Sequence, residues 1–95
     1  MGKNPNTIFR ELYKRARIRH GKIEKSGGGN PVYEMDKQDG CYYVLNKEVV
    51  KSFILEGYSE HRANCHISKW LDYDLITVRF TSDGTKYIGF PKGGI

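Results

Sequence analysis

The feature that most constrains the fold is a pair of short apolar runs that flank a turn near the C-terminus. Residues 75–80 (LITVRF) and 86–90 (KYIGF) are separated by the segment TSDGT. Apolar side chains alternate with other residues in these runs, as in a strand that buries one face. Asp83-Gly84 between them is typical of a tight hairpin turn. The segment therefore predicts a β-hairpin whose buried face carries Ile76, Val78, Phe80, Ile88 and Phe90.

Hydrophobic spacing predicts helices and further strands in the rest of the chain. Apolar residues recur at helical spacing in two segments, whereas shorter runs alternate between apolar and polar residues. In chain order we expect a helix at 7–20, strands at 32–35 and 41–45, a helix at 47–56, a strand at 63–67, and the hairpin. The order α-β-β-α-β-β-β indicates an α+β fold, in which helices pack on one face of an antiparallel sheet.

Length and composition bound the domain organisation. With 95 residues, 38% of them hydrophobic, the chain is expected to form one small domain. We expect a flexible lead-in at 1–6, a flexible Gly-rich loop at 26–30 (SGGGN) and a loose tail at 91–95. The sequence has no apolar run of the ~18 residues that a membrane span needs and no secretory signal. We therefore expect a soluble cytoplasmic protein with two free thiols, Cys41 and Cys65.

The positive charge is concentrated at the start of the chain. The whole chain has a net charge of +5. Residues 1–25 carry eight Lys and Arg against two Glu, a net charge of +6, and residues 26–95 carry eight against nine acidic residues, a net charge of −1. A near-neutral body with one basic segment is typical of a protein with an anionic partner.

The basic residues follow the predicted N-terminal helix in two groups. At helical periodicity, Arg10, Lys14 and Arg17 fall opposite the apolar stripe of the helix. Arg15 and Arg19 fall at the edge of that stripe, where long basic side chains can bury their stems and keep their charges in water. The helix is therefore expected to pack through one face and to present Lys and Arg to solvent.

This arrangement predicts a non-enzymatic protein that binds DNA or RNA. Lys and Arg that neutralise phosphates release counterions, which drives sequence-independent binding. Exposed tyrosines beside them can stack on unpaired bases, and Tyr42 or Tyr87 is expected on an open face of the sheet. The candidate binding residues are Arg10, Lys14, Arg15, Arg17, Arg19, Lys22, Tyr42 and Tyr87. The plain structural alternative is a solvated helix face with tyrosines packed at the edge of the core.

A second hypothesis assigns the same surface to a protein partner. The basic helix could dock on an acidic surface of a nucleic-acid-processing complex, since Arg and Tyr are frequent in interface hot spots. The chain would then be an inhibitor or adaptor, comparable only in size to small phage proteins that block host defence or transcription. A homodimer, paired along the edge of the last strand, would double the basic surface.

Residues that could carry chemistry give weaker signals. His61, Cys65 and His66, with Cys41, are of the types that ligate zinc, but neighbours in a strand point to opposite faces. A metal-independent ribonuclease could use His20 and His61 as acid and base with Arg62 beside the phosphate. Asp72, Asp74 and Glu60 are too few and too scattered to indicate a magnesium site. We therefore predict no catalytic residue, metal or cofactor.

Overall fold

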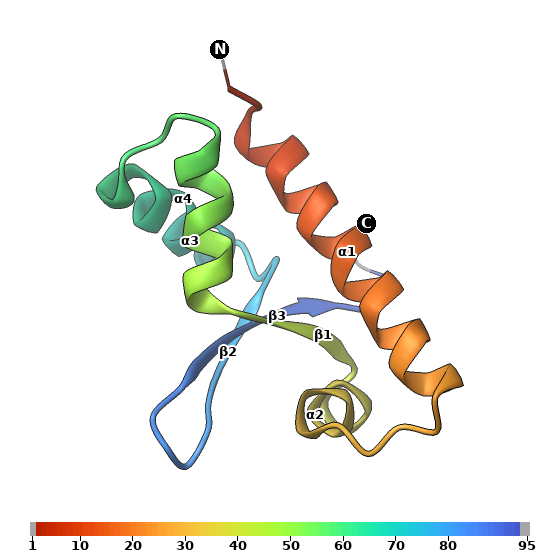
Figure 1. The fold of residues 1–95 in the computed structure, drawn as a ribbon. Coiled ribbons are helices and arrows are strands. Elements are labelled where there is room, and N and C mark those ends of the chain that lie inside the picture. Colours follow the sequence, from red (N-terminus) through yellow and green to blue (C-terminus); the bar gives the residue numbers. More distant parts are fainter. Residues whose placement is uncertain (1, 94–95) are drawn as a thin grey trace.

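The structure is a computed structural model that describes residues 2–93 (Figure 1). Its elements, in chain order, are α1 (Pro5–Lys25), α2 (Pro31–Asp39), β1 (Cys41–Leu45), α3 (Asn46–Leu55), α4 (Glu60–Asp72), β2 (Thr77–Phe80) and β3 (Lys86–Pro91). The strands form an antiparallel sheet in the order β1-β3-β2. The last strand, β3, is central and paired on both sides, so the expected pairing of a second copy along its edge is wrong. The predicted α+β fold with an antiparallel sheet is confirmed.

The C-terminal hairpin is present as predicted. β2 pairs with β3 so that Val78 lies opposite Ile88 and Thr77 lies opposite Gly89. The connecting turn is closed by a hydrogen bond from the Thr81 amide to the Thr85 carbonyl, 2.9 Å long. The alternating pattern and the Asp-Gly turn thus predict both strands. The expected burial of Phe80 is wrong, because this residue is 64% exposed at the end of β2, whereas Ile88 and Phe90 are buried.

The segment 32–35 is a helix, so the strand predicted there is wrong. Asn30 caps α2 by accepting hydrogen bonds from the backbone amides of Val32 (2.9 Å) and Tyr33 (3.3 Å). Pro31 occupies the first helical turn, and Gly40 ends the helix in the left-handed conformation with φ 69°. An Asn-Pro start and a Gly end therefore outweigh a run of apolar residues that is too short to define a period.

The segment 63–67 is also helical, so the strand predicted there is wrong. Ser59 caps α4 by accepting a hydrogen bond from the Arg62 amide (3.1 Å). Ala63, Ile67 and Trp70 are buried, which is the spacing of one helix face. Cys65, which suggested the alternation, is exposed. The two corrections leave a three-stranded sheet in place of the larger one predicted.

The N-terminal helix is longer than predicted. It begins at Pro5, where Asn4 caps it by accepting a hydrogen bond from the Thr7 amide (2.9 Å), and it extends to Lys25. Beyond it, the amide of Gly28 donates to the carbonyl of Ile23 (3.0 Å), a hydrogen bond that closes the helix end. Of the predicted lead-in and loose tail, Met1 and residues 94–95 lie outside the described residues.

The main core lies between the sheet and three helices. α1, α3 and α4 lie on one face of the sheet (Figure 1), where Leu12, Phe53 and Trp70 pack against Ile88 and Phe90. The unpredicted α2 packs on the second face, where its Met35 contacts Cys41 and Tyr43. The expected packing of helices on one face is therefore met by α1 and α3, which α4 joins, whereas α2 covers part of the other face. α1 lies at the edge of the molecule, which leaves its outer side free (Figure 1).

Candidate nucleic-acid interface

The outer side of α1 carries a row of exposed basic residues. α1 has 21 residues and is therefore about 32 Å long at ~1.5 Å per residue. Its inner side is fixed by the buried Leu12 and Ala16, and this orientation turns Arg10, Lys14 and Arg17 outward. All three are exposed, as predicted. We call Arg10, Lys14, Arg17 and Lys25 the outer row.

A second group of basic residues lies on the side of α1 that borders α3. Arg15 and Lys22 are exposed, whereas Arg19 is partly buried. The Arg15 Nη2 atom donates a hydrogen bond of 3.2 Å to Ser52 Oγ in α3. We call Arg15, Arg19 and Lys22 the flank row. The edge position predicted for Arg15 and Arg19 is where the structure places them.

Most of this positive charge has no carboxylate partner. The two acidic residues of α1 are engaged elsewhere: Glu11 pairs with Lys3 at 2.8 Å, and Glu24 accepts a hydrogen bond from the Tyr33 hydroxyl at 3.3 Å. Within residues 2–93, ion pairs are absent from six exposed basic residues, namely Arg10, Lys14, Arg15, Arg17, Lys22 and Lys25. The helix therefore presents a positive field that the protein itself does not neutralise.

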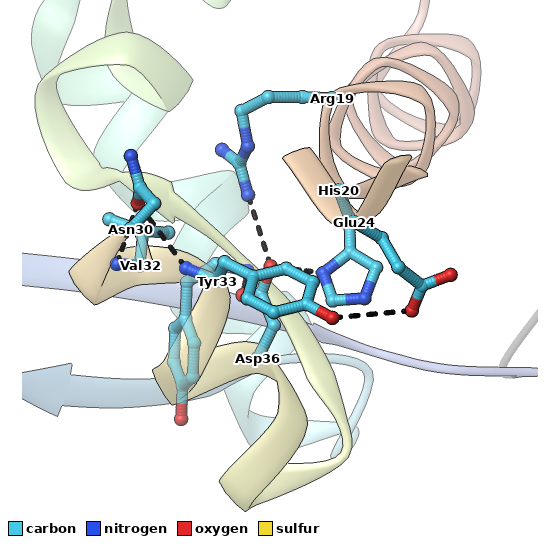
Figure 2. A network of polar contacts seen from close by, with 8 residues as sticks. Arg19, His20, Glu24, Asn30, Val32, Tyr33 and Asp36 are labelled. Carbon is cyan, nitrogen blue, oxygen red and sulfur yellow. Dashed lines mark hydrogen bonds and ion pairs between the residues drawn. The ribbon is translucent and has the colours of Figure 1, made fainter. Parts of the chain in front are cut away.

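A buried carboxylate holds the C-terminal half of α1 in place (Figure 2). Asp36 of α2 is fully buried, and its Oδ2 atom lies 2.9 Å from His20 Nδ1 and 3.4 Å from Arg19 Nη2. Its Oδ1 atom accepts a hydrogen bond of 2.8 Å from the Tyr43 amide in β1. The sequence does not predict a role for this residue, because Asp36 directly follows the expected strand at 32–35 and matches no motif. Arg19 is therefore anchored through one nitrogen rather than free in solvent.

Tyr33 completes this network. Its ring stacks on His20 with 4.7 Å between ring centroids, and its hydroxyl donates to Glu24 (Figure 2). Burial, followed by the nearby Glu24 carboxylate, raises the pKa of Tyr33, so the hydroxyl remains a donor at neutral pH. The contact joins the Glu24 carboxylate to Tyr33 of α2.

The two candidate tyrosines are partly buried and pack within the fold. Tyr42 is on the covered face of the sheet, edge-on to Tyr13 (5.5 Å) and His20 (5.3 Å), so its placement on an open face is wrong. Tyr87 is partly buried on the second face, edge-on to Tyr43 at 6.4 Å. Both rings are thus engaged in aromatic contacts within the fold.

A second polar network, also not anticipated from the sequence, joins α2 to the sheet. Asp39 Oδ2 accepts hydrogen bonds from the Tyr43 hydroxyl (2.5 Å) and from Arg79 Nη1 (2.6 Å). These donors lower the pKa of Asp39. Burial, followed by the bond to Asp39, raises the pKa of Tyr43 above its ordinary value. The partners of this network are mutually satisfied, so it fixes the second face and offers no free reactive group.

The residues considered for zinc binding are divided among three surroundings. The helix α4 brings His61 Nε2 to 3.6 Å from Cys65 Sγ on the solvent side. His66 points the other way and stacks on Phe53 at 5.7 Å, and burial, followed by Lys69 and Arg62, lowers its pKa. Cys41 is buried on the second face of the sheet. Within residues 2–93, no three His, Cys, Asp or Glu side chains are grouped to hold a metal.

The residues considered for RNA cleavage do not meet either. His20 is buried between Asp36, Tyr33 and Tyr42, whereas His61 contacts Cys65 on the exposed side of α4. The acid–base pair of the ribonuclease hypothesis is therefore not assembled.

Comparisons with known proteins do not add a function. No protein family model, no curated protein and no solved structure gives a significant match to the chain. Among the described residues, none of the helices is long and apolar enough to span a lipid bilayer. The functional argument therefore depends on the surface of α1.

Proposed function

We propose that this protein binds nucleic acid without catalysing a reaction, and that α1 makes the contact. The observation that supports the proposal is the set of six exposed basic side chains on α1 that have no carboxylate partner within residues 2–93. Such side chains attract the phosphate backbone of DNA or RNA, and the release of counterions drives the association. Free thiols at Cys41 and Cys65 are compatible with a reducing cytoplasm, where we place this activity.

The spacing of the outer row suits a phosphate backbone. Arg10 and Lys14 are separated by about 6 Å along the helix axis, and Lys14 and Arg17 by about 4.5 Å. A DNA duplex carries one charge per ~1.7 Å of its axis, so each side chain of the row can reach a different phosphate. Contacts of this kind fix position and carry no sequence information, so we expect little sequence preference. Tyr42 and Tyr87 have no part in this proposal.

The test is a titration of short fluorescent DNA and RNA, single- and double-stranded, at several salt concentrations. The variant Arg10→Ala/Lys14→Ala/Arg17→Ala removes three charges from the outer row. We expect it to bind more weakly and to reduce the slope of log affinity against log salt by about 2 to 3. A matched control, Lys47→Ala/Lys69→Ala/Lys86→Ala, removes the same charge from exposed positions on α3, α4 and β3.

The control variant should keep most of the wild-type slope. Equal slopes in both triple variants would mean that overall charge, and not α1, governs binding. If the wild-type protein binds none of the four polymers at low salt, the proposal is wrong, and the basic helix would instead face an acidic protein surface, as in the inhibitor hypothesis.

A further inference from the structure

A groove lies between α1 and α3, over β1. Its volume is about 260 Å³, and its polar lining consists of Arg15, Arg19, Glu48 and Ser52 above apolar residues that include Val44. This volume is below the ~300–1,000 Å³ of pockets for drug-sized ligands. The groove therefore suits a small group such as a phosphate rather than a whole cofactor.

Arg19 brings unused hydrogen-bond donors to this groove. Its only ion pair within residues 2–93 is the 3.4 Å contact of Nη2 with Asp36. Its Nε atom is shielded from solvent and has no hydrogen-bond partner among these residues. A guanidinium has five N–H donors, and a buried donor without an acceptor is unfavourable. An acceptor that enters the groove would remove this deficit.

Arg15, one helical turn before Arg19 in α1, reaches across the groove to Ser52 in α3. Ser52 Oγ donates to the carbonyl of Glu48 at 3.0 Å and accepts from Arg15 Nη2 at 3.2 Å. These two hydrogen bonds hold the Arg15 guanidinium beside α3, at the groove that Arg19 also lines. Two arginines that line one small groove can each donate paired hydrogen bonds to a phosphate.

We propose that this groove is a phosphate subsite, and that it takes a phosphodiester group of the nucleic acid bound by α1. The inference rests on the proposed function, because the flank row continues the charged surface of the outer row. Arg15 and Arg19 donate to the phosphate oxygens. Glu48, which lines the same groove, opposes the anion and weakens its binding. The balance between these groups sets the affinity of the subsite.

Glu48 supplies a sharp test. Inorganic phosphate is titrated into the ¹⁵N-labelled full-length protein, and the Ser52 amide and Arg15 Nε–H signals are followed. We expect saturable shifts at both groups, and about threefold tighter phosphate binding in Glu48→Gln. The control, Glu60→Gln, removes the same charge from an exposed position in α4 and should leave phosphate affinity unchanged. Arg15→Gln, also at an exposed position, should abolish the saturable shift at Ser52.

A second titration uses an oligonucleotide without terminal phosphates, so that only phosphodiester groups are present. Shifts at the same two groups would support the subsite. Absence of a saturable shift with either probe, equal gains in Glu48→Gln and Glu60→Gln, or shifts with inorganic phosphate alone would overturn it. Failure of the proposed function is recognised separately: the polymer would then bind nowhere on α1, whereas failure of the subsite leaves binding through Arg10, Lys14 and Arg17 intact.

Discussion

At the scale of single residues, His66 shows how packing changes a titration. Its ring is partly buried, parallel to Phe53 at 5.7 Å and edge-on to Tyr58 at 5.5 Å. Burial disfavours the charged imidazolium and lowers the pKa of His66, and the positive charges of Lys69 and Arg62 act in the same direction. The folded protein therefore binds a proton at this site less readily than the unfolded chain does.

This difference predicts a pH dependence of stability. Below pH 6.5, the ordinary pKa of histidine, His66 is protonated in the unfolded chain but stays largely neutral in the folded protein. The free energy of unfolding should therefore fall as pH drops from about 6.5, and this contribution should level off below the lowered pKa. In urea unfolding at a series of pH values, His66→Gln should lose less stability than the wild-type protein over this range. Parallel curves would contradict the assignment.

Residue placement was predictable for α1 and not for the tyrosines. The exposure of Arg10, Lys14 and Arg17 followed from the apolar stripe alone, because a helix with one buried face fixes the direction of every other side chain. The face of Tyr42 depended on which neighbouring elements were helices. The sequence predicts a strand in the preceding segment, so it does not show which face of β1 the helices cover.

At the scale of elements, Asp36 joins three parts of the fold. It contacts His20 and Arg19 in α1 and the Tyr43 amide in β1, and it belongs to α2 itself. The carboxylate of Asp36, which makes these contacts, is fully buried. Removal of the carboxylate leaves the imidazole and the amide buried without their acceptor, which is more costly than the loss of an exposed contact.

We therefore expect Asp36→Ala to destabilise the protein by about 3 kcal/mol. Asp72→Ala, at an exposed position in the last turn of α4, is the control and should change stability by less than about 0.5 kcal/mol. Urea unfolding followed by circular dichroism measures both changes. A small and equal effect of the two substitutions would show that Asp36 is not the link between α1, α2 and β1.

Elements with a strong period or a specific turn were predictable, and short ones were not. The hairpin of β2 and β3 combined alternation with an Asp-Gly turn, and α1 and α3 each had several turns of apolar spacing. The sequence predicts strands in place of α2 and α4 for two reasons. Val32, Tyr33 and Met35 form a short apolar run, and Ala63, Cys65 and Ile67 alternate with polar residues by chance within a helix. Their caps, Asn30-Pro31 and Ser59, were the better signal.

At the scale of the whole molecule, charge and packing are divided between different surfaces. α1, α3 and α4 bury the main core against one face of the sheet, and the second face is joined to α2 by the Asp39 and Tyr43 contacts. The net positive charge of the chain is left on the outer and flank rows of α1. The sequence shows this division as a charge imbalance. That these basic residues have no carboxylate partner within residues 2–93, Arg19 excepted, could be seen only in the three-dimensional structure.

The central claim is that α1 is the nucleic-acid interface, and chemical-shift mapping tests it most directly. Duplex DNA or RNA is added to the ¹⁵N-labelled protein at low salt, and amide shifts are followed along the chain. We predict the largest changes at Arg10, Lys14, Arg17 and Lys22, with little change at Tyr43 and Tyr87 on the second face of the sheet. Changes concentrated on the second face or on α4, or a spectrum that the polymer leaves unaltered, would contradict the claim.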